Sequence, residues 1–279
     1  MSDPVDLAPE LALPPADLQT DSIELMRRFC ADWLNKANAD VCRQIMSAEY
    51  RVEIGGIVLS GLAEYVPATL QQLRQFPGLE IVVHEVISNG NQMALRFTEH
   101  GGSTQGNYAA WVGIALFWSD GSVLVRNVTE EDYTSRRRQL GSGVPDALSD
   151  ALLEPWVTEP RAPNAGAETR VRDWLEAGGL SVRDAQESRL TWDEGAAASV
   201  PILNVTSTIV LDLFSAGETV VFRVVESGGY HDGLDLPDQL LGKSGSLSSV
   251  GIVRADRTNA ITGHVVRDRA GLRRALSRA

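Results

Sequence analysis

The sequence predicts a chain of the α+β class with two tandem domains, each a curved antiparallel sheet wrapped on helices. One pattern occurs twice at an offset of 127 residues: Gly90, Arg96, Glu99, Gly101 and Gly102 return as Gly217, Arg223, Glu226, Gly228 and Gly229. The 279 residues are enough for two domains that each bury a core. In the first half, expected helices are followed by expected strands, as in a compact α+β unit.

Composition predicts where the domain boundaries lie. Residues 1–20 carry four acidic and no basic side chains with four prolines, so we expect a flexible acidic arm and not a secretion signal. The first domain is expected over 21–141. A stretch rich in proline, alanine and acid follows over 142–164, and it predicts an ordered strap between the domains. The second domain is expected over 165–279.

The first domain should begin with helices. A helix is expected over 22–36, where apolar residues recur at helical spacing: Ile23, Met26, Phe29, Cys30 and Trp33. Asp21 or Ser22 can cap this helix. A short helix over 39–46 and a third over 62–76 follow, and Pro77-Gly78 ends the third.

Strands make up the rest of the first domain. A short strand is expected over 50–54, followed by a turn at Gly55-Gly56. Four further strands are expected, over 79–87, 92–99, 107–118 and 123–133. The turns Asn89-Gly90 and Asp120-Gly121 favour positive φ, so they predict hairpins between neighbouring strands.

The second domain is less regular. A helix containing Trp174 is expected over 165–175, but residues 182–199 show no clear periodicity and no third helix precedes Thr206. We therefore expect a degenerate front end and a shallower cone.

Charge and composition exclude several classes of protein. A net charge of −12 argues against nucleic acid or an anionic membrane as partner, because both would be repelled. The arginine runs at 136–138 and 267–278 are interpreted as solvated helix ends. No apolar stretch is long enough for a membrane helix. Two cysteines, Cys30 and Cys42, fit a reducing cytoplasm and provide no metal knuckle.

Short motifs follow one another in a similar order in the two halves. In the first half these are Pro77-Gly78-Leu79, Ala94-Leu95-Arg96, the turn at 102–106, Asp132, and Gln139-Leu140-Gly141. In the second half they are Val221-Phe222-Arg223, the turn at 229–233 with His231, the strand at 250–253, and Asp268 followed by Gly271-Leu272. This series resembles the SnoaL-like polyketide cyclases of the nuclear transport factor 2-like superfamily. The resemblance implies two cones with a pocket between sheet and helices, and it places Asp132 at the catalytic aspartate.

The sequence also departs from this family pattern. Thr104 stands where the family often has histidine, and Val128 where it often has tryptophan. Thr98, two residues after Arg96, disfavours an epoxide hydrolase of the limonene type. Phe29 and Trp33 stand where ketosteroid isomerases have a helical tyrosine, which disfavours steroid isomerisation.

Acidic residues near the end of the last strand are the main catalytic candidates. Alternation places Glu130 and Asp132 on one face, which we take as the inward face, and Glu131 on the other. A carboxylate in an apolar pocket has a raised pKa suited to proton transfer. The alternative is that 130–132 is a solvated strand end before a helix. Glu53 is a secondary acid candidate.

Two arginines lie in apolar strands, and each needs an acidic partner if buried. Glu99 or Asp132 could pair with Arg96, and Arg96 or His100 could stabilise an oxyanion. Glu226 or Asp268 could pair with Arg223. Either pair could equally be a structural salt bridge.

The remaining candidates are histidines and aromatic residues. His84 and His100 are possible acid–base groups, although packed or surface histidines are commoner. Substrate-binding candidates are Tyr50, Tyr108, Trp111 and Trp118, which could instead be core residues. In the second domain His231 and Asp268 form a candidate base and orienting acid, unless His231 belongs to a plain surface hairpin.

These observations favour a cytoplasmic, cofactor-free acid–base enzyme without metal. The sequence has no phosphate loop, dinucleotide fingerprint, zinc motif or nucleophile elbow. The expected partner is a hydrophobic, aromatic or polyketide-like small molecule, and the outcome could be cyclisation, isomerisation, dehydration or carbon–carbon lysis. The second domain would form a pseudo-dimer with the first, with further homo-oligomerisation left open. The alternative is a non-catalytic binding or scaffold protein.

Overall fold

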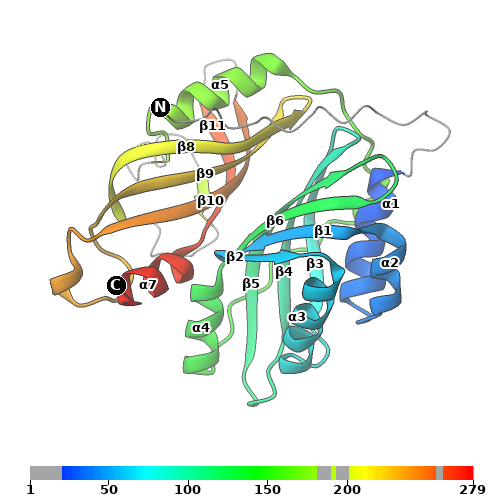
Figure 1. Cartoon of the computed structure of the whole chain (residues 1–279), viewed down its shortest axis with the longest axis horizontal. Helices are drawn as coiled ribbons and strands as arrows, with labels where there is room; N and C mark the ends of the chain where they lie inside the picture. Colours follow the sequence, from blue (N-terminus) through cyan, green and yellow to red (C-terminus); the bar gives the residue numbers. More distant parts are fainter. Residues whose placement is uncertain (1–20, 181–189, 193–200, 256–259, 279) are drawn as a thin grey trace.

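A computed structural model describes residues 21–180, 190–192, 201–255 and 260–278. Two curved sheets lie against each other, and helices cover their outer sides (Figure 1). This is the predicted α+β plan in two tandem halves. Among the described helices, none has both the length and the apolar character that a membrane span requires.

The first half contains a sheet of six strands. They are β1 (Met46–Ile54), β2 (Ile57–Ser60), β3 (Glu80–Ser88), β4 (Gln92–Gly102), β5 (Tyr108–Ser119) and β6 (Leu124–Glu131). The order is β2-β1-β6-β5-β4-β3. The hairpin prediction for β3 to β6 is confirmed, but β1 pairs with β6 in parallel, so the sheet is not entirely antiparallel.

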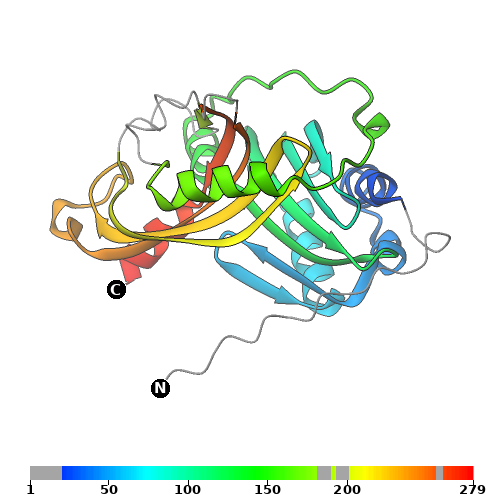
Figure 2. The same cartoon turned by 90° about the horizontal axis from the view of Figure 1, so that it is seen from above.

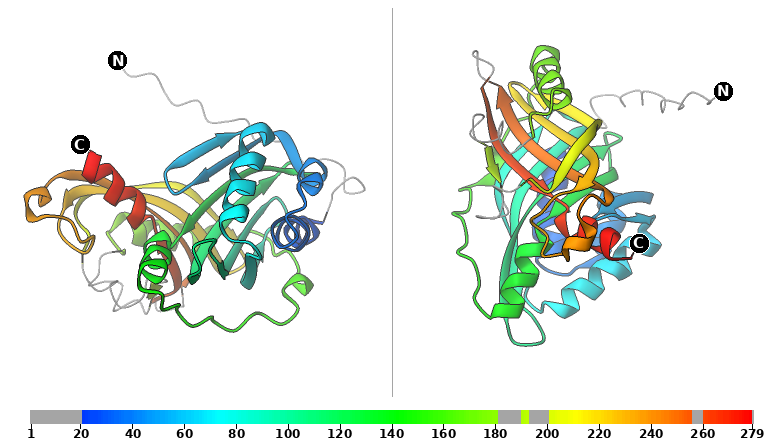
Figure 3. Two further views of the ribbon diagram at one scale, coloured as in Figure 1. Left: turned by 90° about the horizontal axis from the view of Figure 1, so that it is seen from below. Right: turned by 90° about the vertical axis from the view of Figure 1, so that its left-hand side faces the viewer.

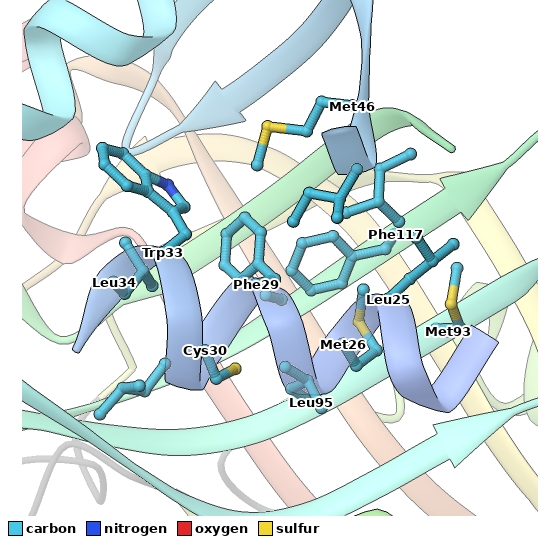
Figure 4. Close-up of a cluster of buried hydrophobic side chains, with 14 of the residues drawn as sticks. Leu25, Met26, Phe29, Cys30, Trp33, Leu34, Met46, Met93, Leu95 and Phe117 are labelled. Atoms are coloured by element: carbon cyan, nitrogen blue, oxygen red, sulfur yellow. The ribbon is translucent and has the colours of Figure 1, made fainter. Parts of the chain in front are cut away.

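Helices pack on the face of this sheet that is turned away from the second sheet, which we call its inner face because it lines the cone. They are α1 (Ser22–Arg27), the π-helical segment η2 (Arg28–Leu34), η3 (Ala39–Val41), α2 (Cys42–Ile45), α3 (Leu62–Gln75) and α4 (Tyr133–Ser142). Asp21 caps α1 through the amide of Ile23 at 2.9 Å, whereas Ser22 bonds the hydroxyl of Ser88. The apolar stripe of α1 and η2 faces β4 and β5, where Phe29 meets Phe117 edge to face (Figure 4).

The second half repeats this topology. It contains α5 (Ala165–Glu176), β7 (Leu190–Trp192), β8 (Leu203–Ala216), β9 (Thr219–Tyr230), η6 (Asp238–Leu240), β10 (Ser244–Ala255), β11 (Ile261–Arg267) and α7 (Arg269–Arg278). Its strand order is β7-β11-β10-β9-β8, and β7 pairs with β11 in parallel, as β1 does with β6. The predicted irregular stretch at 182–199 lies outside the described residues, except that 190–192 is a strand.

The sequence repeat occupies matching places in the two sheets. Arg96 lies on β4 and Arg223 on β9. Each of these strands is three places along its sheet from the strand that pairs in parallel with β6 or β11. The residue after β6 and the residue after β11 are both aspartates that cap a helix. Asp132 accepts the amide of Ser135 at 2.9 Å, and Asp268 accepts the amide of Gly271 at 2.7 Å. The two halves therefore correspond residue by residue at this point.

The two sheets pack face to face (Figure 2). Ile114, Leu116 and Val128 of the first sheet meet Phe214, Val250 and Ile252 of the second in one buried cluster. Beside this cluster, the guanidinium of Arg126 pairs with Asp212 at 2.6 Å, and Arg223 pairs with Glu53 at 2.8 Å. Apolar burial and cross-sheet ion pairs thus hold the halves together.

The segment between the halves runs along β3. The amide of Leu152 donates to the carbonyl of Val83 at 3.0 Å, and that of Arg161 donates to Ser88 at 2.9 Å. The short helix η4 (Pro155–Val157) places Trp156 against the core of the first half.

Candidate functional site

A large cavity lies in the first half, between the inner face of the sheet and helices α3 and α4. Its volume is about 1070 Å³. Most of its wall is apolar, and the wall includes Phe29, Leu95 and Phe117 from the cluster in Figure 4. A cavity of this size and character is typical of small-molecule sites.

Two glutamates face into this cavity. Side chains alternate along a strand, so the face of β4 that carries Leu95 and Phe97 also carries Glu99. On β6, the same rule brings Glu131 to the cavity. Glu99 is 5% exposed and Glu131 is 4% exposed.

Hydrogen-bond donors hold both carboxylates in place. The amide nitrogen of Gln72 on α3 donates to Oε2 of Glu99 at 3.0 Å. The indole nitrogen of Trp111 donates to Oε2 of Glu131 at 2.7 Å. Tyr133, the first residue of α4, forms a further hydrogen bond with Glu131. Each carboxylate therefore has a fixed orientation.

Burial raises the pKa of Glu99 well above its ordinary value, and the charge of Glu131 raises it further. Burial also raises the pKa of Glu131. The two buried carboxylates therefore interact, and the pKa of each lies above its ordinary value.

Arg136 lines the same cavity as this pair. Its positive charge lowers the pKa of both glutamates and so limits the upward shift. The guanidinium carbon lies 4.3 Å from the ring centre of Tyr133 and 5.0 Å from that of Trp111. Cation–π contacts therefore fix Arg136 beside the glutamates.

The second half contributes to the rim of the cavity. Helix α7 lies beside α4 (Figures 1 and 3), and Ala270, Arg273, Arg274, Ser277 and Arg278 line the cavity. Arg274 donates to the carbonyl of Gly55 at 2.7 Å, which joins α7 to the turn after β1. The helix ends expected to be only solvated thus border the cavity.

The expected inward face of β6 was the wrong one. The predicted alternation holds, but Glu131, with Asn127 and Thr129, faces the cavity. Glu130 faces the second sheet, where burial and the charge of Asp268 raise its pKa to about 8. Asp132 caps α4 and pairs with Arg269 at 3.0 Å. Tyr133 belongs to that helix and not to the strand.

The arginine pairings also differ from the expectation. Arg96 faces away from the cavity and Glu99, and no ion pair of Arg96 occurs among the described residues. Arg223 pairs with Glu53, and its guanidinium also lies 3.9 Å from Asp212, so neither Glu226 nor Asp268 is its partner. Glu53 belongs to this cross-sheet network and does not line the cavity.

The candidate histidines lie outside the cavity. The ring of His84 bonds the carbonyl of Asp150 at 2.9 Å and the hydroxyl of Thr98 at 2.7 Å, which ties the connecting segment to the sheet. His100 bonds the hydroxyl of Tyr108 near the far end of β4. In the second half, His231 is exposed after β9, whereas Asp268 is buried as a helix cap.

The four aromatic candidates lie in four different places. Trp111 is buried and binds Glu131, so it positions a carboxylate. Tyr50 is buried behind the cavity wall, against Tyr65. Trp118 lies between the sheets, with Arg126 4.3 Å from its ring centre. Tyr108 is exposed.

Sequence reasoning missed the glutamate pair for an identifiable reason. Leu95, Phe97 and Glu99 share one strand face, and this alternation could have indicated that Glu99 faces inward. Asp132 three residues before Ser135 is a helix-capping signal, and it ends the strand at Glu131. Gln72 and Arg136 come from helices, and no sequence signal we recognise brings them to the pair. Among the described residues, no metal-binding group of three side chains occurs.

Comparison with known proteins gives structural matches only. No protein-family model matches the sequence, and no curated protein matches it. A protein of Jannaschia sp. CCS1 described as a SnoaL-like polyketide cyclase is 15% identical, with a TM-score of 0.42, over 47% of this chain and 99% of its own. TsrD from Streptomyces laurentii is 19% identical, with a TM-score of 0.39, over 43% and 93%.

A third match is a protein of Catenulispora acidiphila with a ketosteroid isomerase-like fold, solved in complex with trimethylamine. It is 13% identical, with a TM-score of 0.40, over 44% of this chain and 95% of its own. Each match spans less than half of this chain and nearly all of the other protein. These likenesses concern the fold and carry no information on substrate.

Proposed function

We propose that the protein is a cofactor-free acid–base enzyme that moves a proton on a hydrophobic small molecule in the cavity of its first half. One observation carries the proposal: Glu99 and Glu131 are both buried, line the same apolar cavity, and the charge of Glu131 raises the pKa of Glu99. Structural carboxylates are usually neutralised by a cation in direct contact. Among the described residues, neither of these two carboxylates forms a salt bridge.

In this proposal Glu99 and Glu131 share one proton near neutral pH, and the chemistry follows from that arrangement. The ionised glutamate removes a proton from a carbon next to a carbonyl group, and the protonated one donates a hydrogen bond to the carbonyl oxygen as negative charge develops there. Arg136 stabilises that charge. Return of the proton to another carbon gives isomerisation. Departure of a hydroxyl group as water, with a proton from the glutamate acid, gives dehydration, and attack on a second carbonyl, whose oxygen takes that proton, gives cyclisation.

The residues around the pair support proton transfer. Trp111 and Gln72 fix the carboxylates, so reorganisation during the reaction is small. The apolar wall excludes water, which keeps the raised pKa values in place. Asp132, the catalytic residue that the family resemblance implied, acts in this proposal as a helix cap and interdomain ion pair.

The test is a mass-spectrometric product screen against aromatic diols, polyketide aldehydes and enones. Wild type should convert a panel member, and Glu131→Gln should lower turnover by a factor on the order of 10² to 10⁴. Asp132→Asn is the matched control, because asparagine also caps helices, and it should keep turnover within several-fold. Equal turnover of Glu131→Gln and wild type contradicts the proposal. Loss of turnover in Asp132→Asn alone would assign the catalytic role to Asp132 instead.

A second function, ligand carriage, has one observation in its favour: the cavity is large and apolar, and its rim comprises residues of both halves. No conversion in the screen, together with thermal stabilisation by a panel member in wild type and Glu131→Gln alike, would support carriage.

A further inference from the structure

Five arginines line the cavity of a chain whose net charge is −12: Arg136, Arg137, Arg273, Arg274 and Arg278. The acidic residues in its wall, Glu99 and Glu131, are buried, whereas Arg137, Arg274 and Arg278 are exposed. Positive charge therefore gathers on α4 and α7, on two sides of the opening, and comes from both halves of the molecule.

Two of these arginines are already engaged. Arg136 lies over the rings of Tyr133 and Trp111, and Arg274 donates to Gly55. The other three, Arg137, Arg273 and Arg278, have no side-chain hydrogen bond or ion pair to any described residue. By contrast, Arg138, the neighbour of Arg137 on α4, pairs with Asp146.

We propose that Arg137, Arg273 and Arg278 bind an anionic group, such as a carboxylate, at one end of a hydrophobic ligand. The guanidinium fork matches a carboxylate in shape and charge. The apolar wall takes the rest of the ligand. This proposal deepens the proposed function by naming the substrate class: an apolar acid whose reacting carbon lies inward and whose anionic group lies at the opening.

The orientation follows from charge. An anion at the inner end would meet Glu99 and Glu131, which is unfavourable. An anion at the opening meets arginines and stays partly hydrated. Nucleic acid is a poor alternative ligand, because the rest of the acidic surface would repel it.

The inference also gives the second half a role in binding. Arg273 and Arg278 belong to α7, and α7 follows the last strand of the second sheet. A single copy of the first half would lack two of the three free arginines. The binding site is complete only in the tandem chain.

The test uses two fluorescent probes with the same ring system. One is 8-anilinonaphthalene-1-sulfonate, which carries an anionic group, and the other is uncharged N-phenyl-1-naphthylamine. Both are titrated against the full chain, against Arg273→Gln/Arg278→Gln, and against the control Arg138→Gln/Arg172→Gln, which removes the same charge away from the cavity.

The double variant at the cavity should lose roughly tenfold or more in affinity for the sulfonate and keep its affinity for the uncharged probe. The control should bind both probes as wild type does. Equal losses for both probes, equal losses in the control, or no saturable binding of the sulfonate to wild type would each overturn the inference. The titration needs no turnover, so it stands or falls separately from the proposed reaction.

Discussion

In the first half, the residue before the helix-capping Asp132 is Glu131, and in the second half the residue before the capping Asp268 is Arg267. Both positions end the last strand of a sheet. Glu131 faces a second carboxylate, Glu99, whereas the charge of Arg267 lowers the otherwise raised pKa of Glu226. Arg267 also lies over Trp192, 4.4 Å from its ring centre. The first half thus places two buried carboxylates near each other, whereas the second half places the cation Arg267 near its buried acid.

The packing beside these residues also differs between the two halves. The fourth residue after the capping aspartate is Arg136 in the first half and Leu272 in the second. Leu272 packs with Leu247 and Leu276 in a closed apolar cluster. The first half thus has a large cavity beside its buried carboxylates, whereas apolar side chains fill the matching place in the second half. The second half covers the first sheet and supplies α7.

The largest expected effect concerns turnover. Glu99→Gln should lower the turnover found in the product screen by a factor on the order of 10² to 10⁴, because it removes one partner of the shared proton. Glu226→Gln makes the same change in the repeated position and should leave turnover unchanged. A similar loss in both variants would mean that the halves do not differ in function as inferred.

Replacing one charged residue by glutamine should change the free energy of unfolding in opposite directions in the two halves. Arg267→Gln leaves buried Glu226 without its compensating charge and should lower the free energy of unfolding by about 3 kcal/mol. Glu131→Gln removes a buried carboxylate whose charge raises the pKa of Glu99, and it should raise the free energy of unfolding by about 1 kcal/mol at pH 8. Urea unfolding measures both values, and the same sign for both variants would contradict the assignment of charges.

A smaller difference is expected at a glycine that both halves share. A Cβ added at Gly113 would lie 2.4 Å from Cζ of Phe97, and one at Gly251 would lie 2.3 Å from Cζ of Phe222. Phe97 borders the cavity and can move into it, whereas Phe222 is fully buried against Trp174. Gly251→Ala should therefore cost about 3 kcal/mol and Gly113→Ala about 1 kcal/mol. Thermal unfolding measures both losses of stability, and an equal loss in the two variants would indicate that both sites are equally packed.

A pH dependence is expected at the interface between the halves. The pKa of Glu130 is raised from 4.5 to about 8 by burial and by Asp268, against hydrogen bonding from Ser248 and the charge of Arg223. The folded state therefore binds this proton more tightly, and stability should fall as pH rises from about 4.5 to about 8. Glu130→Gln should flatten the fall in melting temperature over this range. An unchanged slope would show that other groups cause it.

The sequence predicted the fold better than the site. The repeat of Arg96 and Glu99 and the turn at Asn89-Gly90 are local signals, and they correctly indicated two copies and their hairpins. The direction in which a strand face points depends on tertiary packing, so Glu131 was assigned to the wrong side. Arg273 reaches the cavity only because the two halves pack together, and no pattern within 267–278 records that arrangement.

The central claim is that Glu99 and Glu131 share a proton at neutral pH, and a ¹³C NMR titration of glutamate-labelled protein tests it directly. Signals are assigned with Glu99→Gln, Glu131→Gln and Glu226→Gln and followed from about pH 4 to about pH 9. The expected result is a Glu99 carboxyl that stays protonated at neutral pH and whose pKa falls in Glu131→Gln. Titration of both carboxyls near the ordinary value of 4.5, unaffected by the other substitution, would contradict the claim.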